Sequence, residues 1–489
     1  MRETIICTST PTGASGAIAI HDLQTGATLA SFKQTTSALH STAIVQTQGV
    51  LGGLLFAVQQ DKPILNLYNF QKDQINSKTV LPEKLSCIAV DHAGEYLAGG
   101  TLQGRIYIWE LSSGILFNAW DAHYRKITVL KFSNDGSALL SGSEDSGVSV
   151  WSVPRLLDDD TQTEPPAPYC VLSDHTLPVT DILCGVGVFP RCRILSASLD
   201  HSVKLWDLAS HSLLTTFQFP HPLTCLAWDP TERVFFAASP NGSVHQVNLF
   251  KPRDVPGSYS AVGGAGAADI IRVDDDERDK AQKRRLISVG EPVLSLAISL
   301  TSTLLLVGTS AGLIHVFDIP SHQLLRSIST HKGTSINYLA TMLKPPDLVG
   351  HVSLSLQNGS SSDSGPILPR SLPPLQRMRD AKSREVHDIT VMLPHRPAHQ
   401  DESASCSAED LLREHAFFTA QHSSEHQDST SLQSRVNELE SEVVSLREQL
   451  GKAKGLNDVM WETYVHKMLG KEREEPEPER RRKRGRTDS

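Results

Sequence analysis

One pattern recurs in the middle of the chain, and a recurring unit constrains a fold more than any single motif does. It is clearest in LAGGTLQGRIYIWELSSGILFNAW around Trp109, LSGSEDSGVSVWSV around Trp151 and SASLDHSVKLWDLASHSLLTTF around Trp206. The copies share a strand of small residues, a tight polar turn and an alternating apolar strand that ends in Trp. The pattern therefore predicts a repeated unit of consecutive antiparallel strands.

Weaker copies of the unit appear once these three are aligned. In these weaker copies, the Trp and the residue that follows it are replaced by His21-Asp22, Tyr68-Asn69, Val247-Asn248 and Phe317-Asp318. The positions 21, 68, 109, 151, 206, 247 and 317 are separated by 47, 41, 42, 55, 41 and 70 residues. WD40 repeats run ~40–45 residues, with four strands in each blade. The sequence therefore predicts an all-β fold, a seven-bladed WD40 β-propeller over residues 1–345.

The two longest intervals contain insertions. Residues 155–169 are acidic and proline-rich, and residues 251–285 are rich in Gly and Ala and then densely charged. The sequence does not decide which segment closes the ring. The apolar segment Ser335–Leu343 would supply the outermost strand that joins the first blade, or Thr4–Cys7 would do so.

Polar residues recur in the two clearest repeats in the order His, Ser, Asp, Trp. The two sets are His123, Ser141, Asp145, Trp151 and His175, Ser196, Asp200, Trp206. They resemble the structural tetrad of WD repeats, in which Asp orients His and Ser links His to the indole N–H. A Ser–His–Asp hydrolase triad is the alternative interpretation. Repetition argues against it, because a scaffold needs the set in several blades and an active site needs it once.

The composition changes after the propeller. Residues 346–407 are rich in Ser, Gly and Pro and predict a mostly disordered linker. A helical region is expected over 408–470, with a coiled coil at 432–450. Its a/d positions are Leu432, Val436, Leu439, Val443, Leu446 and Leu450. Such a narrow stripe favours self-association or a partner helix over packing on the propeller.

A charged tail, residues 471–489, carries a basic cluster. Its members are Arg480, Arg481, Arg482, Lys483, Arg484 and Arg486. The cluster indicates a nuclear-localisation signal or an electrostatic contact with nucleic acid, and the alternative is a merely solvated tail. Phosphate contacts of this kind would carry no sequence readout.

Several classes of protein are disfavoured. The seven cysteines are scattered without a close CxxC pair, which indicates reduced thiols in an intracellular compartment. No secretory signal and no run of ~18 apolar residues is present, so we expect no membrane association. We find no P-loop, dinucleotide fingerprint, nucleophile elbow or metal-ligand cluster, and expect neither catalysis, cofactor nor metal.

The combination of features resembles one family, the fungal WD-repeat subunit of a trimeric complex that acts in pre-rRNA processing. The resemblance rests on the early first blade MRETIICTST and on GRIYIWELSSGILFNAWDAHYRKITVLKFSNDGSALLSGSEDSGVSVW. The acidic insertion that follows and the coiled coil with its basic end complete it. It covers essentially the whole chain and is strongest over residues 80–210.

The resemblance implies a non-catalytic scaffold in the nucleus that supports removal of the second internal transcribed spacer. It implies two partner subunits, one a helical-repeat scaffold, together with pre-60S particles and the AAA ATPase midasin. The alternatives are a substrate receptor or adaptor of a ubiquitin ligase, and a chromatin or replication scaffold. Co-purified ribosomal precursors or a ligase core would distinguish them.

Overall fold

The computed structural model describes residues 2–10, 16–45, 53–158, 165–252, 259–263, 269–273, 286–345, 348, 372–378 and 426–471. The chain divides into two compact units, Met1–Val391 and Met392–Ser489. Described elements of the first unit are almost all strands, and one long helix represents the second. Among the described helices, none has both the length and the apolar character that crossing a membrane requires.

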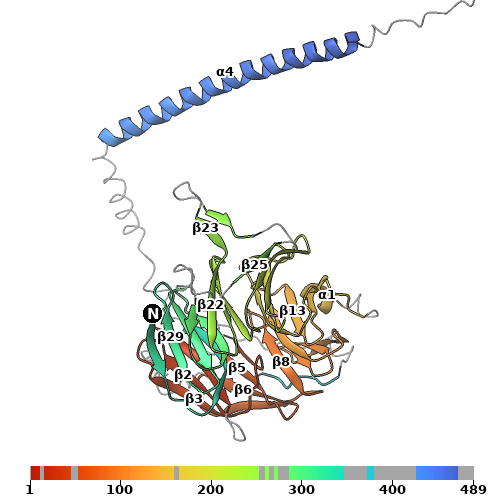
Figure 1. Cartoon of the computed structure of the whole chain (residues 1–489), viewed down its shortest axis with the longest axis vertical. Coiled ribbons are helices and arrows are strands. Elements are labelled where there is room, and N and C mark those ends of the chain that lie inside the picture. Colours follow the sequence, from red (N-terminus) through yellow and green to blue (C-terminus); the bar gives the residue numbers. More distant parts are fainter. Residues whose placement is uncertain are drawn as a thin grey trace, which may run out of the picture. The chain divides into compact units, whose positions relative to one another are not determined.

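The strands of the first unit form seven blades, which confirms the predicted propeller (Figure 1). From the inside outwards, blade 1 has β31 (Ser335–Leu343), β1 (Glu3–Thr10), β2 (Gly16–Asp22) and β3 (Thr28–Thr35). Blade 2 has β4 (Thr42–Val45), β5 (Leu54–Val58), β6 (Ile64–Asn69) and β7 (Ile75–Val80). Blade 3 has β8 (Leu85–Val90), β9 (Tyr96–Thr101), β10 (Arg105–Glu110) and β11 (Leu116–Asp121).

The remaining blades follow in chain order. Blade 4 has β12 (Ile127–Phe132), β13 (Ala138–Ser143), β14 (Val148–Ser152) and β15 (Cys170–Leu172). Blade 5 has β16 (Val179–Cys184), β17 (Arg193–Ser198), β18 (Ser202–Asp207) and β19 (Ser212–Gln218). Blade 6 has β20 (Cys225–Trp228), β21 (Val234–Ala238), β22 (Ser243–Asn248) and β26 (Leu286–Ser288). Blade 7 has β27 (Val293–Ile298), β28 (Leu304–Thr309), β29 (Ile314–Asp318) and β30 (Leu324–Ile328).

Blade 1 closes the ring by joining the two ends of the propeller. β1 pairs antiparallel with β31, from Glu3 opposite Leu343 to Thr10 opposite Ser335. The closure therefore uses both segments that the sequence left as alternatives. The prediction of an outermost strand for Ser335–Leu343 is wrong, because β1, β2 and β3 fill the outer positions and only the inner one remains.

Side-chain hydroxyls link neighbouring blades around the axis. Oγ of Ser86 donates to the carbonyl of Ile127 at 2.6 Å, and Oγ1 of Thr128 donates to that of Val179 at 2.7 Å. Further links run from Thr224 to Val293 at 2.9 Å and from Ser295 to Ile336 at 2.9 Å. Because these groups are shielded from much of the solvent, each hydrogen bond helps to fix the relative position of two blades.

The insertions add structure at the edges of the blades. α1 (Val153–Leu157) lies at the start of the acidic insertion. The second insertion forms the hairpin of β23 (Phe250–Pro252) and β24 (Tyr259–Ala261), and then β25 (Ile270–Arg272). β25 pairs in parallel with β19 and makes a fifth strand on the outside of blade 5.

The described part of the second unit is α4 (His426–Lys471). Ion pairs of Arg435 with Glu438 and of Lys452 with Glu448 lie along its surface at 2.7 and 2.8 Å. The predicted coiled-coil segment lies within it and ends just before Gly451. Of the linker predicted over 346–407, only 348 and 372–378 are described, and residues 408–425 of the expected helical region lie outside the described residues.

Candidate protein-binding face

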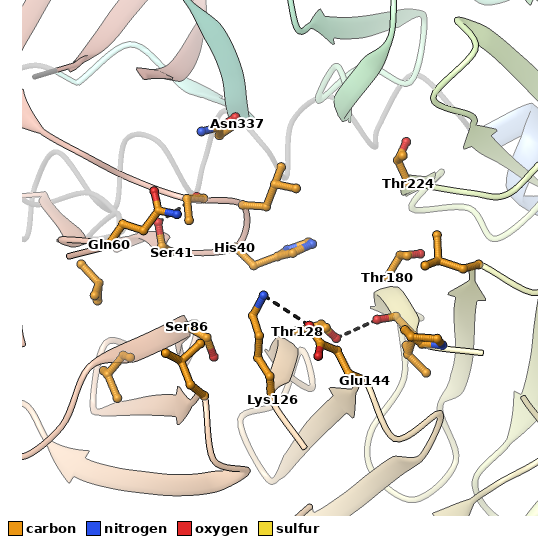
Figure 2. A pocket seen from close by; sticks show the side chains of 18 of the residues that line it. His40, Ser41, Gln60, Ser86, Lys126, Thr128, Glu144, Thr180, Thr224 and Asn337 are labelled. Carbon is orange, nitrogen blue, oxygen red and sulfur yellow. Dashed lines mark hydrogen bonds and ion pairs between the residues drawn. The ribbon is translucent and has the colours of Figure 1, made fainter. Parts of the chain in front are cut away.

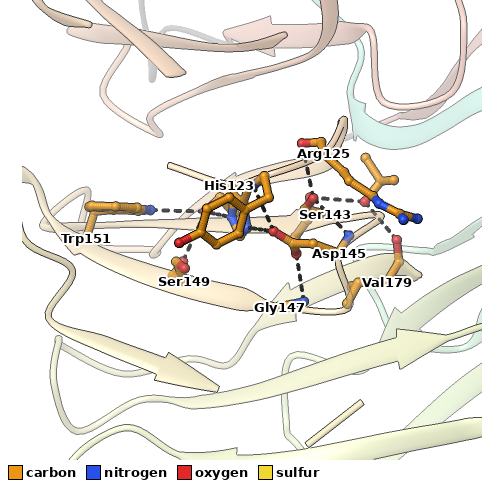
Figure 3. A network of polar contacts seen from close by, with 12 residues as sticks. His123, Arg125, Ser143, Asp145, Gly147, Ser149, Trp151 and Val179 are labelled. Atoms are coloured by element: carbon orange, nitrogen blue, oxygen red, sulfur yellow. Dashed lines mark hydrogen bonds and ion pairs between the residues drawn. The ribbon is translucent and has the colours of Figure 1, made fainter. Parts of the chain in front are cut away.

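The predicted polar residues of blade 4 lie in one connected network (Figure 3). His123 Nδ1 lies 3.1 Å from Asp145 Oδ2, and its Nε2 lies 2.8 Å from Ser141 Oγ. Trp151 Nε1 donates to the same hydroxyl at 3.0 Å. Because a carboxylate only accepts, His123 donates its Nδ1 proton to Asp145.

Blade 5 repeats the network with nearly the same geometry. His175 lies 2.9 Å from Asp200 and 2.8 Å from Ser196, and Trp206 donates to Ser196 at 2.8 Å. Ser202 adds a hydroxyl donor to Asp200 at 2.6 Å. Tryptophan takes the position where an active site would need space for a substrate, and the serine hydroxyl is buried. The arrangement suits a structural link and leaves no access for nucleophilic attack.

The aspartates of the networks are held in the ionised form. Burial alone would raise the pKa of Asp145, but His123 and the amides of Gly147 and Tyr124 lower it to about 2. At Asp200 the same opposition of burial and hydrogen bonds with His175 also lowers the pKa. Both carboxylates are therefore charged acceptors at neutral pH.

The networks also order one end of the ring. Asp145 accepts the amide of Tyr124 at 3.1 Å, and Asp200 accepts that of Thr176 at 3.1 Å. Both amides belong to connections between an outer strand and the next inner strand. Successive strands of a blade run antiparallel. The connections between blades therefore lie at the same end of the ring as the turns that join the second strand of each blade to its third strand. We call this end the tetrad face.

Large apolar side chains are exposed on the tetrad face. Tyr124, beside the blade 4 network, is 98% exposed, and Leu177, beside the blade 5 network, is 47% exposed. Leu39, Leu102 and Leu199, from other loops and turns of this end, are also exposed. Apolar groups gathered on rigid loops are typical of a surface that a protein partner covers.

The same end of the ring opens into a central cavity of about 700 Å³ (Figure 2). Leu39, Leu102 and Leu199 line it, and His40 points into it. Lys126 and Glu144 form an ion pair of 3.5 Å at its wall. The lining thus combines apolar side chains with a few polar groups, which suits an inserted side chain or loop of a partner.

Blade 1 contains a variant of the network that the sequence analysis missed. His331 Nε2 lies 2.8 Å from His21 Nε2 and 3.4 Å from Cys7 Sγ. Cys7 pairs with Ala19, two residues before His21, as Ser141 pairs with the residue two before its Trp. His21 and Cys7 thus replace Trp and Ser. Cys7 lies 14 residues before His21, whereas Ser141 lies 10 residues before Trp151, so only the strand register relates it to the repeat.

The trio of blade 1 also has the composition of a metal site, since its three donor atoms lie within 4.8 Å of one another. The two ring nitrogens are 2.8 Å apart, whereas ligands of a tetrahedral zinc ion stand about 3.3 Å apart. Burial raises the pKa of Cys7 to about 12, so its thiol is protonated. The contacts are those of a hydrogen-bonded structural network.

The other predicted site residues belong to the second unit. The described coiled-coil side chains, Val436, Leu439, Val443, Leu446 and Leu450, are all exposed on α4. Leu432 lies in the same helix. The basic cluster 480–486 lies outside the described residues.

Comparisons with known proteins agree with this architecture. The family model "WD domain, G-beta repeat" matches residues 115–152 and 167–207. "Pre-rRNA-processing protein IPI3" of Mycosarcoma maydis is 36% identical over 73% of this chain and 71% of the relative. The protein of the same name in Yarrowia lipolytica is 30% identical over 95% and 99%. "WD repeat-containing protein 18" of Homo sapiens is 29% identical over 75% and 76%.

Proposed function

Because the chain belongs to the family of the fungal pre-rRNA-processing protein IPI3, we propose that it is a non-catalytic scaffold subunit in pre-rRNA processing. Within that process it acts in removal of the second internal transcribed spacer and in maturation of the large ribosomal subunit. A nuclear or nucleolar site of action accords with this step. The basic cluster at 480–486 provides a nuclear-localisation signal or an electrostatic contact with RNA.

The apolar tetrad face is the observation that supports a scaffold most directly. Tyr124 and Leu177 project from loops whose amides are tied to Asp145 and Asp200. The surface is therefore ordered before a partner arrives, which reduces the entropy cost of binding. The cavity behind it offers room for a partner side chain.

The partners are those that the family resemblance implies. They are the two other subunits of a trimeric complex, including a helical-repeat scaffold, and pre-60S particles with a midasin-type ATPase. The exposed a/d stripe of α4 adds a second surface, for self-association or for a partner helix. Two separate surfaces on one chain suit a protein that joins other subunits.

Affinity purification of the tagged protein from its own cells tests this function. We expect large-subunit ribosomal proteins, assembly factors and spacer-containing pre-rRNA in the eluate. Replacement of Tyr124 and Leu177 by Asp should remove a subset of these proteins. Val186 and Val188 are exposed at the opposite end of the ring, and their replacement by Asp should leave that subset bound.

Two results would contradict the proposal. Recovery of a ubiquitin-ligase core without pre-rRNA would identify a substrate receptor instead. Chromatin or replication factors without pre-rRNA would identify a scaffold for those processes. The folded state of each variant is checked beforehand by circular dichroism, so that a lost partner reports on the surface.

A further inference from the structure

Blade 3 keeps the tryptophan of the tetrad without its polar partners. Trp109 of β10 occupies the tetrad position, and Gly99 replaces the serine, since it pairs with Tyr107 two residues before the Trp. In blade 4 the tetrad histidine lies 28 residues before the Trp and the aspartate 6 residues before it. At the same distances from Trp109 this blade has Leu81 and Gln103. The indole of this blade therefore has no tetrad hydroxyl to bond.

The local packing leaves little room for a side chain at Gly99. A Cβ atom on Gly99 would lie 2.5 Å from Leu85 Cδ1 and 3.1 Å from Trp109 Cζ3. Trp109 itself is fully buried. A buried indole N–H needs a hydrogen-bond acceptor, so blade 3 must obtain one from outside the repeat.

A segment far along the chain supplies this acceptor. Trp109 Nε1 donates to the carbonyl of Gln376 at 2.9 Å, and the amide of Gln376 donates to the carbonyl of Gly114 at 2.8 Å. Leu375 is only 7% exposed and packs in the apolar cluster that contains Leu111 and Leu116. The main chain of one residue and the side chain of its neighbour thus anchor the segment.

The blade is shaped to let this segment approach. Gly114, in the turn between β10 and β11, has φ +75°, and a Cβ atom there would lie 2.6 Å from the carbonyl oxygen of Pro374. Glycine therefore serves both the turn and the contact. The segment reads Leu-Pro-Pro-Leu-Gln, and its two prolines favour an extended chain that loses little entropy on docking.

We propose that the side of blade 3 formed by Trp109, Leu111, Gly114 and Leu116, the Trp109 patch, is a peptide-binding site. Its ligand is an extended apolar-Pro-Pro-apolar-Gln segment, and residues 372–376 of the same chain occupy it. The site recognises the ligand by the indole N–H, the Gly114 carbonyl and the pocket for Leu375. This assignment is independent of the proposed role in pre-rRNA processing.

The covalent connection to the propeller explains why a segment of only five residues can occupy the Trp109 patch. Residues 344–371 join β31 to the segment, so the segment belongs to the same chain as its site and is present there at a high effective concentration. An added peptide must compete with this concentration in the native chain. Emptying the site in cis should therefore raise the apparent affinity for an added peptide about tenfold or more.

The experiment uses the full chain and a fluorescent peptide of residues 370–378, followed by fluorescence anisotropy. The Leu375→Asp chain should bind the peptide at least about tenfold more tightly than the native chain. The peptide carrying the same Leu375→Asp change should not bind. The Met378→Asp chain is the matched control, because Met378 is 82% exposed, and should behave as the native chain.

Hydrogen exchange gives a second readout in the same variants. In the native chain the amide of Gln376 should be protected, and Leu375→Asp should remove this protection while Met378→Asp retains it. Equal peptide binding by the native and Leu375→Asp chains, both shown to be folded, would overturn the proposal. Protection of Gln376 that rises with protein concentration would overturn occupation in cis, since docking within one chain does not depend on concentration.

Discussion

Asp200 connects the interior of blade 5 to the tetrad face. It accepts from His175, from Ser202 and from the amide of Thr176. Replacement by Ala leaves a buried imidazole donor unpaired, so we expect Asp200→Ala to lower the free energy of unfolding by about 1–3 kcal/mol. Denaturant unfolding measures this change. Asp174→Ala, at an exposed neighbouring position, is the control, and an unchanged midpoint for Asp200→Ala would refute the expectation.

His21 should make blade 1 sensitive to acid. Burial, and next the neighbouring His331, lower the pKa of His21 from 6.5 to about 4. As the pH falls, His21 is therefore protonated in the unfolded chain before it is protonated in the folded chain. The contribution of His21 to stability is complete above pH 6.5 and is lost as the pH falls from 6.5 to about 4.

The variant His21→Gln tests this expectation. Its melting temperature should fall less steeply between pH 6.5 and 4 than that of the native chain, because one titrating group is absent. His331 remains and also has a pKa lowered by burial, so part of the slope should persist. His92→Gln, at an exposed position, should keep the full native slope. Equal slopes for His21→Gln and the native chain would contradict the assignment.

Residue offsets explain why some site residues could be predicted and others could not. The networks of blades 4 and 5 repeat their residue types, so the pattern itself names His123 and His175. In blade 1 the types change to Cys7 and His21, and only strand register relates them to the repeat. Among the described residues, the contact of Trp109 with Gln376 has no counterpart in another repeat, and it depends on a distant segment.

At the scale of elements, α4 carries a stripe of exposed apolar side chains. Leu439 and Leu446 are 47% and 57% exposed at successive d positions. If the stripe pairs two copies, Leu439→Asp with Leu446→Asp should yield monomers, because charges at d positions oppose helix pairing. Light scattering measures the mass. Val444→Asp with Ser445→Asp, at exposed positions off the stripe, adds the same charge and should leave the mass unchanged.

An equal mass for the native and Leu439→Asp/Leu446→Asp chains would contradict self-pairing. It would leave a partner helix as the occupant of the stripe. The stripe itself was predictable from the alternation of intervals of four and three residues. The helix continues beyond that pattern to Lys471, because helix formation does not require a heptad repeat.

The outer strand of blade 5 shows where prediction of elements ends. Residues 251–285 were recognised as an insertion because they interrupt the spacing of the repeats. Their sequence does not reveal that Ile270–Arg272 pairs in parallel with β19, since three residues carry no clear period. The pairing covers the hydrogen-bonding edge of β19, which would otherwise be open to another chain.

At the scale of the whole molecule, the propeller is a ring held by one junction between distant segments. Ile336 of β31 is fully buried between blades 1 and 7. Ile336→Asp should lower the stability of the entire ring by several kcal/mol, because it places a charge in an apolar core. Five of the six tryptophans lie in blades 3 to 6 and the sixth, Trp461, is exposed on α4, so a change of tryptophan fluorescence in urea reports mainly on blades 3 to 6.

The matched variant is Leu343→Asp, at an exposed position at the end of β31. It should unfold near the native midpoint. If Ile336→Asp left the fluorescence transition of Trp109, Trp151, Trp206 and Trp228 at the native midpoint, the blades would be independent and the ring would not unfold as one unit.

The pairing of β1 with β31 also determines when blade 1 can be completed during translation. Residues 3–10 leave the ribosome before the rest of the propeller, yet their inner neighbour ends at residue 343. At roughly 5–20 residues per second, the inner edge of β1 stays without its partner strand for on the order of 20–70 s, although its other edge can pair with β2. Blade 1 is thus the first to be translated and the last to be completed. During this interval the inner edge of β1 is open to pairing with another chain.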